Sequence, residues 1–277
     1  MTHSHAQQSV LVTGAGGGLG SALAHYAVAR GWHVYAADIN TAALTTAFGS
    51  NPNITPIVMD VSNTESVKQA AAKVASLTDS LSAVVNFAGI LRTGMLVEMD
   101  EAAMQQILDI NVMGTFRVNQ AFFPLVLAGK GRIINISSET GWQSGQPFNG
   151  PYGASKHAIE GYSDSLRREL MLLDIPVIKI QPGPFKTNMT ASIEKNFDAM
   201  AATSHHFADA ITIAKHRAIQ ADTTASDPDI LAAAVYKAMT TPRPKAAYSV
   251  RPDMSRLIMN ALPSWLSDTI IKKFLTK

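Results

Sequence analysis

Short apolar runs recur along the chain, separated by longer segments with helical periodicity. The runs are Val10–Thr13, His33–Asp38, Ile54–Met59, Leu81–Asn86, Gly131–Ile136, Pro176–Gln181 and Ala246–Val250. Such short apolar stretches are typical of strands that are buried on both faces of a parallel sheet. Strands that alternate with helices at this rate predict βαβ units, so we expect one α/β domain.

The helical segments follow the strands in order. They are Ser21–Arg30, Thr64–Thr78, Glu101–Leu127, the stretch from Tyr152 to near Asp174, and Pro228–Met239. We predict Glu101–Leu127 as one long helix, although Asn111 and Gly114 near its middle are poor residues for a helix interior. Asn111 therefore marks a kink, a bound water or a surface-exposed position. Residues 188–227 have helical pieces without strong organisation, and we expect a mobile substrate lid there.

Composition narrows the class of protein. The 277 residues are 47% hydrophobic and 16% charged, which suits one large folded domain spanning residues 1–277. A net charge of +2 gives no reason to expect a nucleic-acid partner. The absence of cysteine removes disulfides and thiolate chemistry and fits a reducing compartment, so we expect a cytoplasmic protein.

Neither end of the chain suggests a membrane span. Residues 1–8 are polar and are expected to form a flexible tail without the apolar region of a signal peptide. No run of about 18 apolar residues occurs anywhere in the sequence. His205, His206 and Asp209 suggest a zinc motif at first sight, but no third histidine follows at a useful spacing, so we predict no metal site.

A glycine-rich turn joins the first strand to the first helix. Strand, glycine turn and helix form the context that a phosphate-binding loop requires. Glycines let the backbone approach a pyrophosphate, and the helix N-terminus offers free N–H groups. The spacing is Thr-Gly-x-x-x-Gly-x-Gly rather than the usual G-x-G-x-x-G, yet this context predicts dinucleotide binding. The predicted contacts in the turn are Gly14, Gly16, Gly17, Gly18, Leu19 and Gly20.

Asp38 ends the second strand, about 20 residues past the glycine turn, where the adenosine ribose of a dinucleotide would lie. A carboxylate there would accept hydrogen bonds from both ribose hydroxyls and repel a 2′-phosphate. The turn Ala15–Gly17 has no Lys or Arg to receive such a phosphate. We therefore predict NAD rather than NADP, with a helix N-cap as the alternative role for Asp38.

Tyr152 and Lys156 stand four residues apart and share one face of a predicted helix. A unit positive charge about 5 Å from a phenol, at an effective dielectric near 20, is worth roughly 3 kcal/mol, or about two pKa units. We expect Tyr152 to exchange a proton near neutral pH. The pair alone is also consistent with a chance feature of a helix start, so its weight comes from the other motifs.

These motifs occur in one order along the chain. They are Thr13-Gly14-x-x-x-Gly18-x-Gly20, Asp60, Asn86-x-Ala88-Gly89, Asn111, Ser138, Tyr152-x-x-x-Lys156 and Pro182-Gly183. In this order the chain resembles the short-chain dehydrogenase/reductase family over nearly its whole length. The resemblance implies a single doubly wound Rossmann domain, with a seven-stranded parallel sheet and helices on both faces. It also implies an NAD(H)-dependent enzyme that interconverts a secondary alcohol and a ketone.

The resemblance assigns roles to individual residues. Tyr152 would be the general acid/base, Lys156 would lower its pKa and hold the nicotinamide ribose, and Ser138 would hydrogen-bond the substrate oxygen. Asn111 would hold a water in a proton relay. The other implied cofactor contacts are Asp60 and Val61 at the adenine, Asn86, Ala88 and Gly89 on the ribose side, Pro182, Gly183 and, at the carboxamide, Thr187.

Two departures from the family pattern are visible. Phe87 stands where many members have a second Asn or an Ala, which affects strand packing more than chemistry. The interval from Ser138 to Tyr152 is one residue longer than in several members, which leaves Ser137 as an alternative to Ser138.

Residues 251–277 are similar to the tails of the 17β-hydroxysteroid and retinol dehydrogenase branch. Their apolar stripes predict a helix pair packed on the domain; the alternatives are a lid over a lipophilic substrate and contact with a membrane surface. Family members usually form dimers or tetramers through the helices of Asn111 and Tyr152, and we expect the same here. An NADP-dependent carbonyl reductase and a non-catalytic dinucleotide-sensing module remain as alternative functions, although the filled Asn-Ser-Tyr-Lys positions argue against the second.

Overall fold

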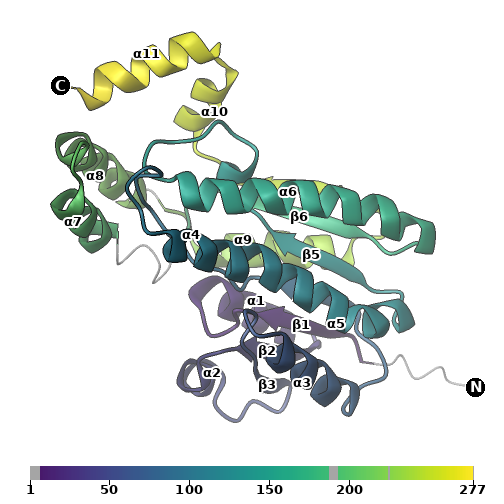
Figure 1. Cartoon of the computed structure of the whole chain (residues 1–277). Coiled ribbons are helices and arrows are strands. Elements are labelled where there is room, and N and C mark those ends of the chain that lie inside the picture. Colours follow the sequence, from purple (N-terminus) through teal and green to yellow (C-terminus); the bar gives the residue numbers. More distant parts are fainter. Residues whose placement is uncertain (1–6, 187–192, 224, 277) are drawn as a thin grey trace, which may run out of the picture.

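A seven-stranded parallel sheet forms the centre of the protein. The structure is a computed structural model that describes residues 7–186, 193–223 and 225–276 (Figure 1). The strands are β1 (Ser9–Thr13), β2 (His33–Asp38), β3 (Ile54–Val58), β4 (Ala83–Asn86), β5 (Arg132–Ile136), β6 (Val177–Pro182) and β7 (Ala247–Val250). Their order in the sheet is β3-β2-β1-β4-β5-β6-β7, and every neighbouring pair is parallel. The predicted doubly wound fold and its strands are confirmed.

Helices cover both faces of the sheet because successive strand residues point to opposite sides. Val10 and Val12 of β1 belong to one core, together with residues of α1 (Gly18–Val28), α2 (Thr41–Phe48) and α9 (Pro228–Thr240). Leu11, between them, belongs to the other core, with residues of α3 (Thr64–Ala75), α5 (Gly114–Ala128) and α6 (Gly150–Leu170). The two layers make β1, β2 and β4 fully covered strands.

The order of the strands determines where a ligand can bind. The chain leaves β1 for β2 on one side, whereas β4 lies on the other side of β1. The loops that follow β1 and β4 therefore diverge and leave a crevice at the carboxyl ends of the strands. The glycine turn, Asp38, Ser138 and the start of α6 all lie at this edge of the sheet.

The predicted long helix is divided into three parts. α4 (Glu101–Leu108) and α5 flank a π-helical turn at Asp109–Met113, which contains Asn111. Asn111 is buried, so the expectation of a surface position is wrong. Its Nδ2 donates to the Ile90 carbonyl at 3.0 Å and to Ser155 Oγ at 3.0 Å, while its Oδ1 accepts from the Ile90 N–H at 2.8 Å. The side chain thus ties the wide turn to the loop after β4.

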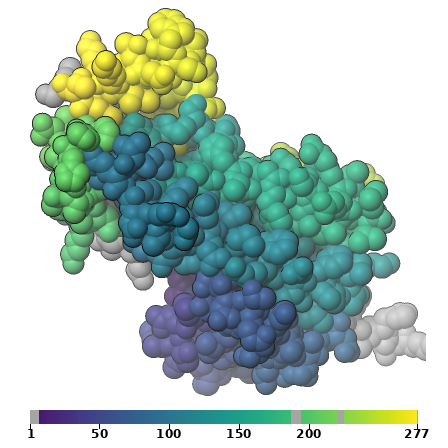
Figure 2. Space-filling view, in the orientation of Figure 1, coloured from purple at the N-terminus to yellow at the C-terminus, as the bar shows by residue number. Residues whose placement is uncertain are grey.

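The last third of the chain adds helices around the crevice. α7 (Ile193–Thr203) and α8 (Ala208–Thr223) pack on each other around Phe197, Met200 and Ile211. α10 (Met254–Ala261) and α11 (Ser264–Leu275) follow β7 and form a lobe that projects beside α8 (Figures 1 and 2). Two short 3₁₀ turns, Glu139–Gly141 and Met171–Leu173, complete the helices of the described residues.

Two expectations about chain segments are only partly covered by the structure. Residues 1–6 of the predicted tail, and residues 188–192 and 224 of the predicted lid, lie outside the described residues. The described part of the lid segment is α7 and α8, and movement of these helices stays a prediction. Within the ranges that the structure describes, no helix combines the length and the apolar character needed to cross a bilayer.

Candidate active site

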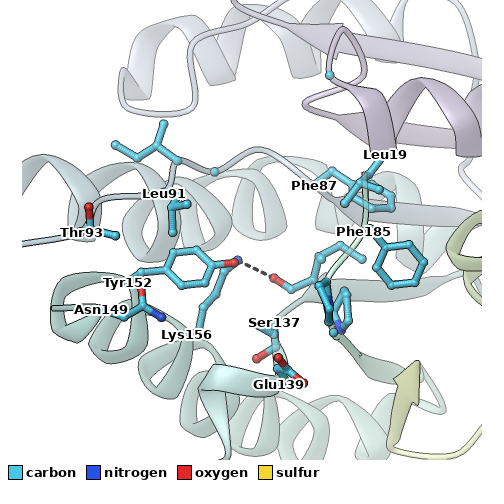
Figure 3. Close-up of a pocket in the computed structure, with 18 of the residues that line it drawn as sticks. Leu19, Phe87, Leu91, Thr93, Ser137, Glu139, Asn149, Tyr152, Lys156 and Phe185 are labelled. Atoms are coloured by element: carbon cyan, nitrogen blue, oxygen red, sulfur yellow. Dashed lines mark hydrogen bonds between the residues drawn. The ribbon is translucent and has the colours of Figure 1, made fainter. Parts of the chain in front are cut away.

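A cavity of about 930 Å³ follows the carboxyl ends of the strands. One end lies at the glycine turn and Asp38, and the other reaches Phe274 and Leu275 on α11. Tyr152 and Lys156 line it between these ends (Figure 3), and Ser138 lines it as well. The volume is near the upper end for small-molecule sites, so the cavity has room for a dinucleotide portion and a substrate portion together.

The glycine turn is shaped by close backbone contacts. Gly14 has a φ of +65°, and a Cβ on it would lie 2.8 Å from the Ala88 nitrogen. A Cβ on Gly20 would lie 2.3 Å from the Gly14 carbonyl oxygen, so the helix can start this close to β1 only with glycine there. No side chain caps α1, whose N-cap is Gly17, and its first amides have no acceptor within the helix. This cradle fits a pyrophosphate, which would accept hydrogen bonds from those amides.

Asp38 lines the cavity at the end of β2. Its Oδ2 accepts from the Gly16 N–H at 3.0 Å, and its Oδ1 accepts from the Asn40 N–H at 2.9 Å. The N-cap of α2 is Asn40, which accepts from the Ala43 N–H, so the alternative role of Asp38 as that cap is wrong. Gly16 supports Asp38 and is not itself among the described residues that line the cavity.

The cations that line the cavity lie far along the chain from the Asp38 strand. Among the described lining residues they are Lys156 on α6, Arg217 on α8 and Arg256 on α10. The described lining from the glycine turn through β2 and β3 carries two carboxylates, Asp38 and Asp60, and no Lys or Arg. A 2′-phosphate on an adenosine ribose bound beside Asp38 would therefore meet repulsion without a local partner.

Most of the other predicted cofactor contacts also line the cavity. They are Gly14, Gly17, Gly18, Leu19, Gly20, Asp60, Val61, Ala88, Gly89, Pro182 and Gly183. Phe87 lines it as well and packs against the core, so the departure from the family pattern affects the wall of the site as well as strand packing. Thr187 lies outside the described residues.

Asn86 is placed differently from the expectation. Its side chain is buried and does not line the cavity; instead its Nδ2 donates to Asn119 Oδ1 at 2.7 Å and to Asn135 Oδ1 at 2.9 Å. The chain continues from Asn135 Nδ2 to Ser163 Oγ and from Asn119 Nδ2 to the Tyr162 hydroxyl. Asn86 thus joins β4 to β5, α5 and α6 through buried amides, and the cofactor contact expected of its side chain is corrected to a structural role.

Tyr152 and Lys156 face the cavity from the first turns of α6 (Figure 3). The Lys156 ammonium lies 5.6 Å from the centre of the Tyr152 ring and donates to the Ile136 carbonyl at 2.8 Å. Burial lowers the pKa of Lys156 to about 8, with the charge of Glu160 acting in the opposite direction. The helix start is set by Pro151 in its first turn, as expected for a residue whose missing N–H costs nothing there.

The pKa of Tyr152 is not near neutral, as the spacing predicted, but raised. Burial raises the pKa of Tyr152 to about 12, a hydrogen bond with Ser138 lowers it, and the charge of Glu139 raises it further. Lys156 lies at about the distance that the spacing predicted, but burial of the phenol disfavours its anion more strongly than the sequence alone could show. Tyr152 therefore holds its proton at neutral pH.

Ser137 and Ser138 both line the cavity, and their hydrogen bonds separate them. Ser138 Oγ accepts from the Thr140 N–H at 3.2 Å and reaches the Tyr152 phenol. Ser137 Oγ is buried and has no hydrogen-bond partner among the described residues. Ser138 is therefore the serine aligned with Tyr152. Asn111 does not line the cavity but holds the loop of Ile90, which does.

Sequence reasoning did not single out several described residues of the substrate portion. Glu139 and Arg256 form an ion pair at its edge, and Arg217 stacks on the Phe274 ring at 4.2 Å. The apolar wall beyond Tyr152 consists of Leu91, Phe148, Phe185, Phe197, Ala214, Ala218, Ile271, Phe274 and Leu275. Glu139 had a sequence signal because it directly follows the predicted substrate-binding serine. Ile271 and Phe274 had another, because they lie in the apolar stripes of residues 251–277, for which a lid over the substrate was one alternative.

The chain is similar in sequence and in fold to known proteins. The sequence profile of the short chain dehydrogenase family matches residues 8–198. Retinol dehydrogenase 7 of Mus musculus is 31% identical over 283 residues, covering 97% of this chain and 89% of that protein. Human 17-beta-hydroxysteroid dehydrogenase type 2 is 36% identical over 199 residues, covering 68% of this chain and 50% of that protein.

Two further comparisons extend the range of relatives. The NADPH-dependent 3-dehydrocapnine reductase of Ornithobacterium rhinotracheale is 28% identical over 278 residues, covering 96% of this chain and 97% of that protein. Among solved structures, a short-chain dehydrogenase from Streptomyces avermitilis superposes with a TM-score of 0.75 at 25% identity, covering 97% of this chain and 95% of that one. Some proteins similar to this chain are thus named for retinol or steroid substrates, and one is named for its dependence on NADPH.

Proposed function

Since the chain belongs to the short-chain dehydrogenase family, we propose that it is an NAD-dependent oxidoreductase that interconverts a lipophilic secondary alcohol and the corresponding ketone. The observation that carries this proposal is that one cavity contains the glycine cradle, Asp38, Ser138, Tyr152 and Lys156. A dinucleotide held by the cradle would extend along the strand ends toward Tyr152, with its nicotinamide ring supplying or accepting the hydride.

The proton chemistry follows from the chain's own groups. The Tyr152 phenol is protonated at neutral pH and stands ready to donate its proton to a ketone oxygen during reduction. Ser138 donates a hydrogen bond to the same oxygen and stabilises the charge that develops on it. Lys156 holds a positive charge near the phenolate that remains, and its pKa of about 8 leaves it charged at neutral pH. In oxidation the same groups act in reverse.

Tyr152→Phe tests this assignment because it removes only the hydroxyl. We expect turnover to fall by about 10²–10⁴-fold, the usual contribution of general acid catalysis, while NADH binding is retained. Tyr236→Phe is the matched control, since Tyr236 packs against Trp32 on the far helical layer. Full turnover by the Tyr152→Phe enzyme would remove the mechanism. If the wild type binds NADH but turns over no compound in a panel of steroids, retinoids and simple alcohols, the dinucleotide-sensing alternative is favoured.

The choice of NAD rests on Asp38 and on the absence of a cation in the described lining around it. We expect NADH to bind more tightly than NADPH, measured by fluorescence titration of both. Asp38→Asn should raise the affinity for NADPH and so reduce the difference in affinity between NADH and NADPH. Asp79→Asn, which removes an exposed carboxylate elsewhere, should leave that difference unchanged. Tighter binding of NADPH by the wild type would favour the NADP-dependent reductase, as in the similar 3-dehydrocapnine reductase.

A lipophilic substrate is proposed from the apolar wall beyond Tyr152. Aromatic and aliphatic residues of α7, α8 and α11 form this wall, and they would bury an apolar substrate body. Each buried methylene is worth about 0.8 kcal/mol, so kcat/KM should rise about fourfold per methylene along a series of secondary alcohols until the wall is filled. A series with no chain-length dependence would contradict this part of the proposal.

Assembly as a homodimer or homotetramer is part of the same proposal. Of the two helices expected at a family interface, α5 carries the exposed apolar side chains Phe116 and Leu127. The 3₁₀ turn that follows α6 carries the exposed Leu172. Light scattering coupled to size-exclusion chromatography measures the mass of the assembly directly. A mass equal to that of one chain at micromolar concentration would contradict it.

A further inference from the structure

A carboxylate is buried in the active-site loop directly after Ser138. Glu139 is only 5% exposed and lines the cavity at its substrate end (Figure 3). Burial raises the pKa of its carboxyl, while the N–H of Asp253 and the charge of Arg256 lower it. A buried charge is costly without partners, so its partners indicate why it is there.

Both oxygens of Glu139 are held by the C-terminal lobe. Oε2 accepts from the Asp253 N–H at 2.7 Å, and Oε1 accepts from Arg256 Nη1 at 3.2 Å. Asp253 is the N-cap of α10 and Arg256 lies in its first turn, so the Glu139 carboxylate binds the start of that helix. The lobe is therefore attached to the residue next to the predicted substrate-binding serine.

Two further contacts fix the same lobe to the active site. The Asn260 side-chain oxygen accepts from the N–H of Ser144 at 2.8 Å and from its hydroxyl at 3.0 Å. At the end of β6 the Gly183 N–H donates to the Val250 carbonyl, and a Cβ on Gly183 would lie 2.0 Å from the Arg251 carbonyl oxygen. The loop that carries Ser138 is thus attached to both ends of α10, through Glu139 at its start and through Ser144 near its end. The segment that leads into the lobe is attached separately to the end of β6.

The Glu139–Arg256 pair also acts on Tyr152 through its charges. After burial and the Ser138 hydrogen bond, Glu139 raises and Arg256 lowers the pKa of Tyr152. The charged groups on the elements packed around the phenol are Lys156 on α6, Glu139 on its 3₁₀ turn, and Asp253 and Arg256 at α10; Arg217 lines the cavity from α8. Because the two members of the pair have opposite signs, their effects on the phenolate largely cancel while both are present.

We propose that Glu139 and Arg256 are positioning residues through which the C-terminal lobe completes the active site. The pair holds the Ser138 loop against α10 and keeps the charge beside Tyr152 balanced. This inference rests on the proposed role of Tyr152 as the proton donor and acceptor. The lobe thus contributes to the geometry and the charge of the catalytic site. Arg256 acts by holding Glu139 and by its charge on Tyr152, rather than by binding the substrate.

The test compares pH profiles of kcat/KM for alcohol oxidation in four enzymes: wild type, Glu139→Gln, Arg256→Gln and the double variant. In Glu139→Gln, loss of the carboxylate should lower the pKa of Tyr152 that controls the profile. In Arg256→Gln, loss of the guanidinium should raise that pKa. We expect each change to be roughly half a pH unit to one pH unit. The double variant should return close to the wild type. Arg256→Lys keeps the positive charge and should restore most of the wild-type profile. The profiles are followed on the alkaline side, where the Glu139 carboxyl is ionised.

A merely structural role predicts something else. Both single variants would then lose stability or raise KM together, with no opposite displacement of the profile, and that result would overturn the proposal. NADH affinity and far-ultraviolet circular dichroism show whether each variant is folded. If the wild type has no turnover, the proposed function fails, but the role of the pair can still be tested. The pKa of Tyr152 in each variant is then measured by nuclear magnetic resonance titration of its ring, whose signals are assigned with Tyr152→Phe. Shifts of the same sign, or none, in that titration would reject the pair.

Discussion

Replacing Lys156 by methionine isolates the cost of burying its ammonium group. Lys156 is 7% exposed and keeps one hydrogen bond, to the Ile136 carbonyl. Its pKa is lowered from the usual 10.5 to about 8 because burial disfavours the charged form. The unfolded chain therefore binds this proton more readily than the folded chain, so stability rises with pH between these two values.

The size of the effect follows from that shift. The difference between the two pKa values, at 1.36 kcal/mol per pH unit, corresponds to a cost of about 3 kcal/mol below pH 8. At pH 9.5 most folded molecules hold Lys156 neutral, and the same linkage relation leaves a cost of about 1 kcal/mol. Methionine has no proton to lose, so it escapes the cost at both pH values. The free energy of unfolding of Lys156→Met minus that of the wild type should fall by about 2 kcal/mol from pH 7 to pH 9.5.

Urea unfolding of both proteins at pH 7 and pH 9.5, at one protein concentration and without dinucleotide, measures this difference. The change with pH is the quantity to compare, because the bond that the neutral amine donates to the Ile136 carbonyl, worth about 0.5–1.5 kcal/mol, is lost in the variant at both pH values and offsets the gain equally. Lys179→Met is the control of opposite sign. Hydrogen bonds and charges from Asp164 and Glu160 raise the pKa of Lys179 against the effect of burial.

The control separates burial from a general effect of removing lysine. Lys179 contributes stability that is fully present below pH 10.5 and is lost only as pH rises through its higher folded value. Lys179→Met should therefore destabilise the protein to the same extent at pH 7 and pH 9.5. A stability difference for Lys156→Met that stays constant between the two pH values would refute the account of Lys156 as a desolvated cation.

Three other changes test separate parts of the structure. Gly20→Ala places a Cβ 2.3 Å from the Gly14 carbonyl oxygen, and we expect a loss of about 1–3 kcal/mol in unfolding free energy together with weaker NADH binding by calorimetry; unchanged binding would contradict the cradle. Ile211→Ala empties a fully buried position between α7 and α8 and should cost about 2–5 kcal/mol, with faster hydrogen exchange in α8 but not in α1. Glu98 accepts hydrogen bonds from Ser204 and the two backbone N–H groups after it, which outweigh desolvation and lower its pKa from 4.5. Its contribution is present above pH 4.5 and lost as pH falls further, so Glu98→Gln should reduce the acid-side fall in melting temperature; an unchanged acid limb would show that these bonds contribute nothing.

The fold followed from the sequence because each strand is a short apolar run bounded by turn residues. The strands, the glycine turn and the position of Tyr152 at the start of α6 agree with expectation. Helix α2 was considered only as the segment that Asp38 would cap in its alternative role, because Thr41–Phe48 has only two buried residues and little periodicity. The wide turn at Asn111 was seen only as an irregularity, because hydrogen bonds to a distant loop, not local propensity, determine it.

The site was less predictable wherever it depends on contacts between distant segments. Neither Glu139 nor Arg256 belongs to a motif, and their pairing arises from residues 117 positions apart. The family resemblance implied that Asn86 lies on the ribose side of the cofactor, but its side-chain amide donates to the side-chain oxygens of Asn119 and Asn135. The pKa of Tyr152 depends on burial, which spacing alone cannot give.

The π-helical turn between α4 and α5 accommodates one residue more than an α-helical turn would. Ile107 and Val126 are both fully buried and lie nineteen positions apart. On an unbroken α-helix they would point about 100° away from each other, whereas one residue absorbed by the wide turn brings them into line. Deleting Asn111 would therefore leave a straighter helix with its apolar seam intact, and a protein that still folds but has lost the amide anchoring the loop of Ile90. Substituting Asn111, by contrast, removes the same amide but keeps the extra residue of the turn.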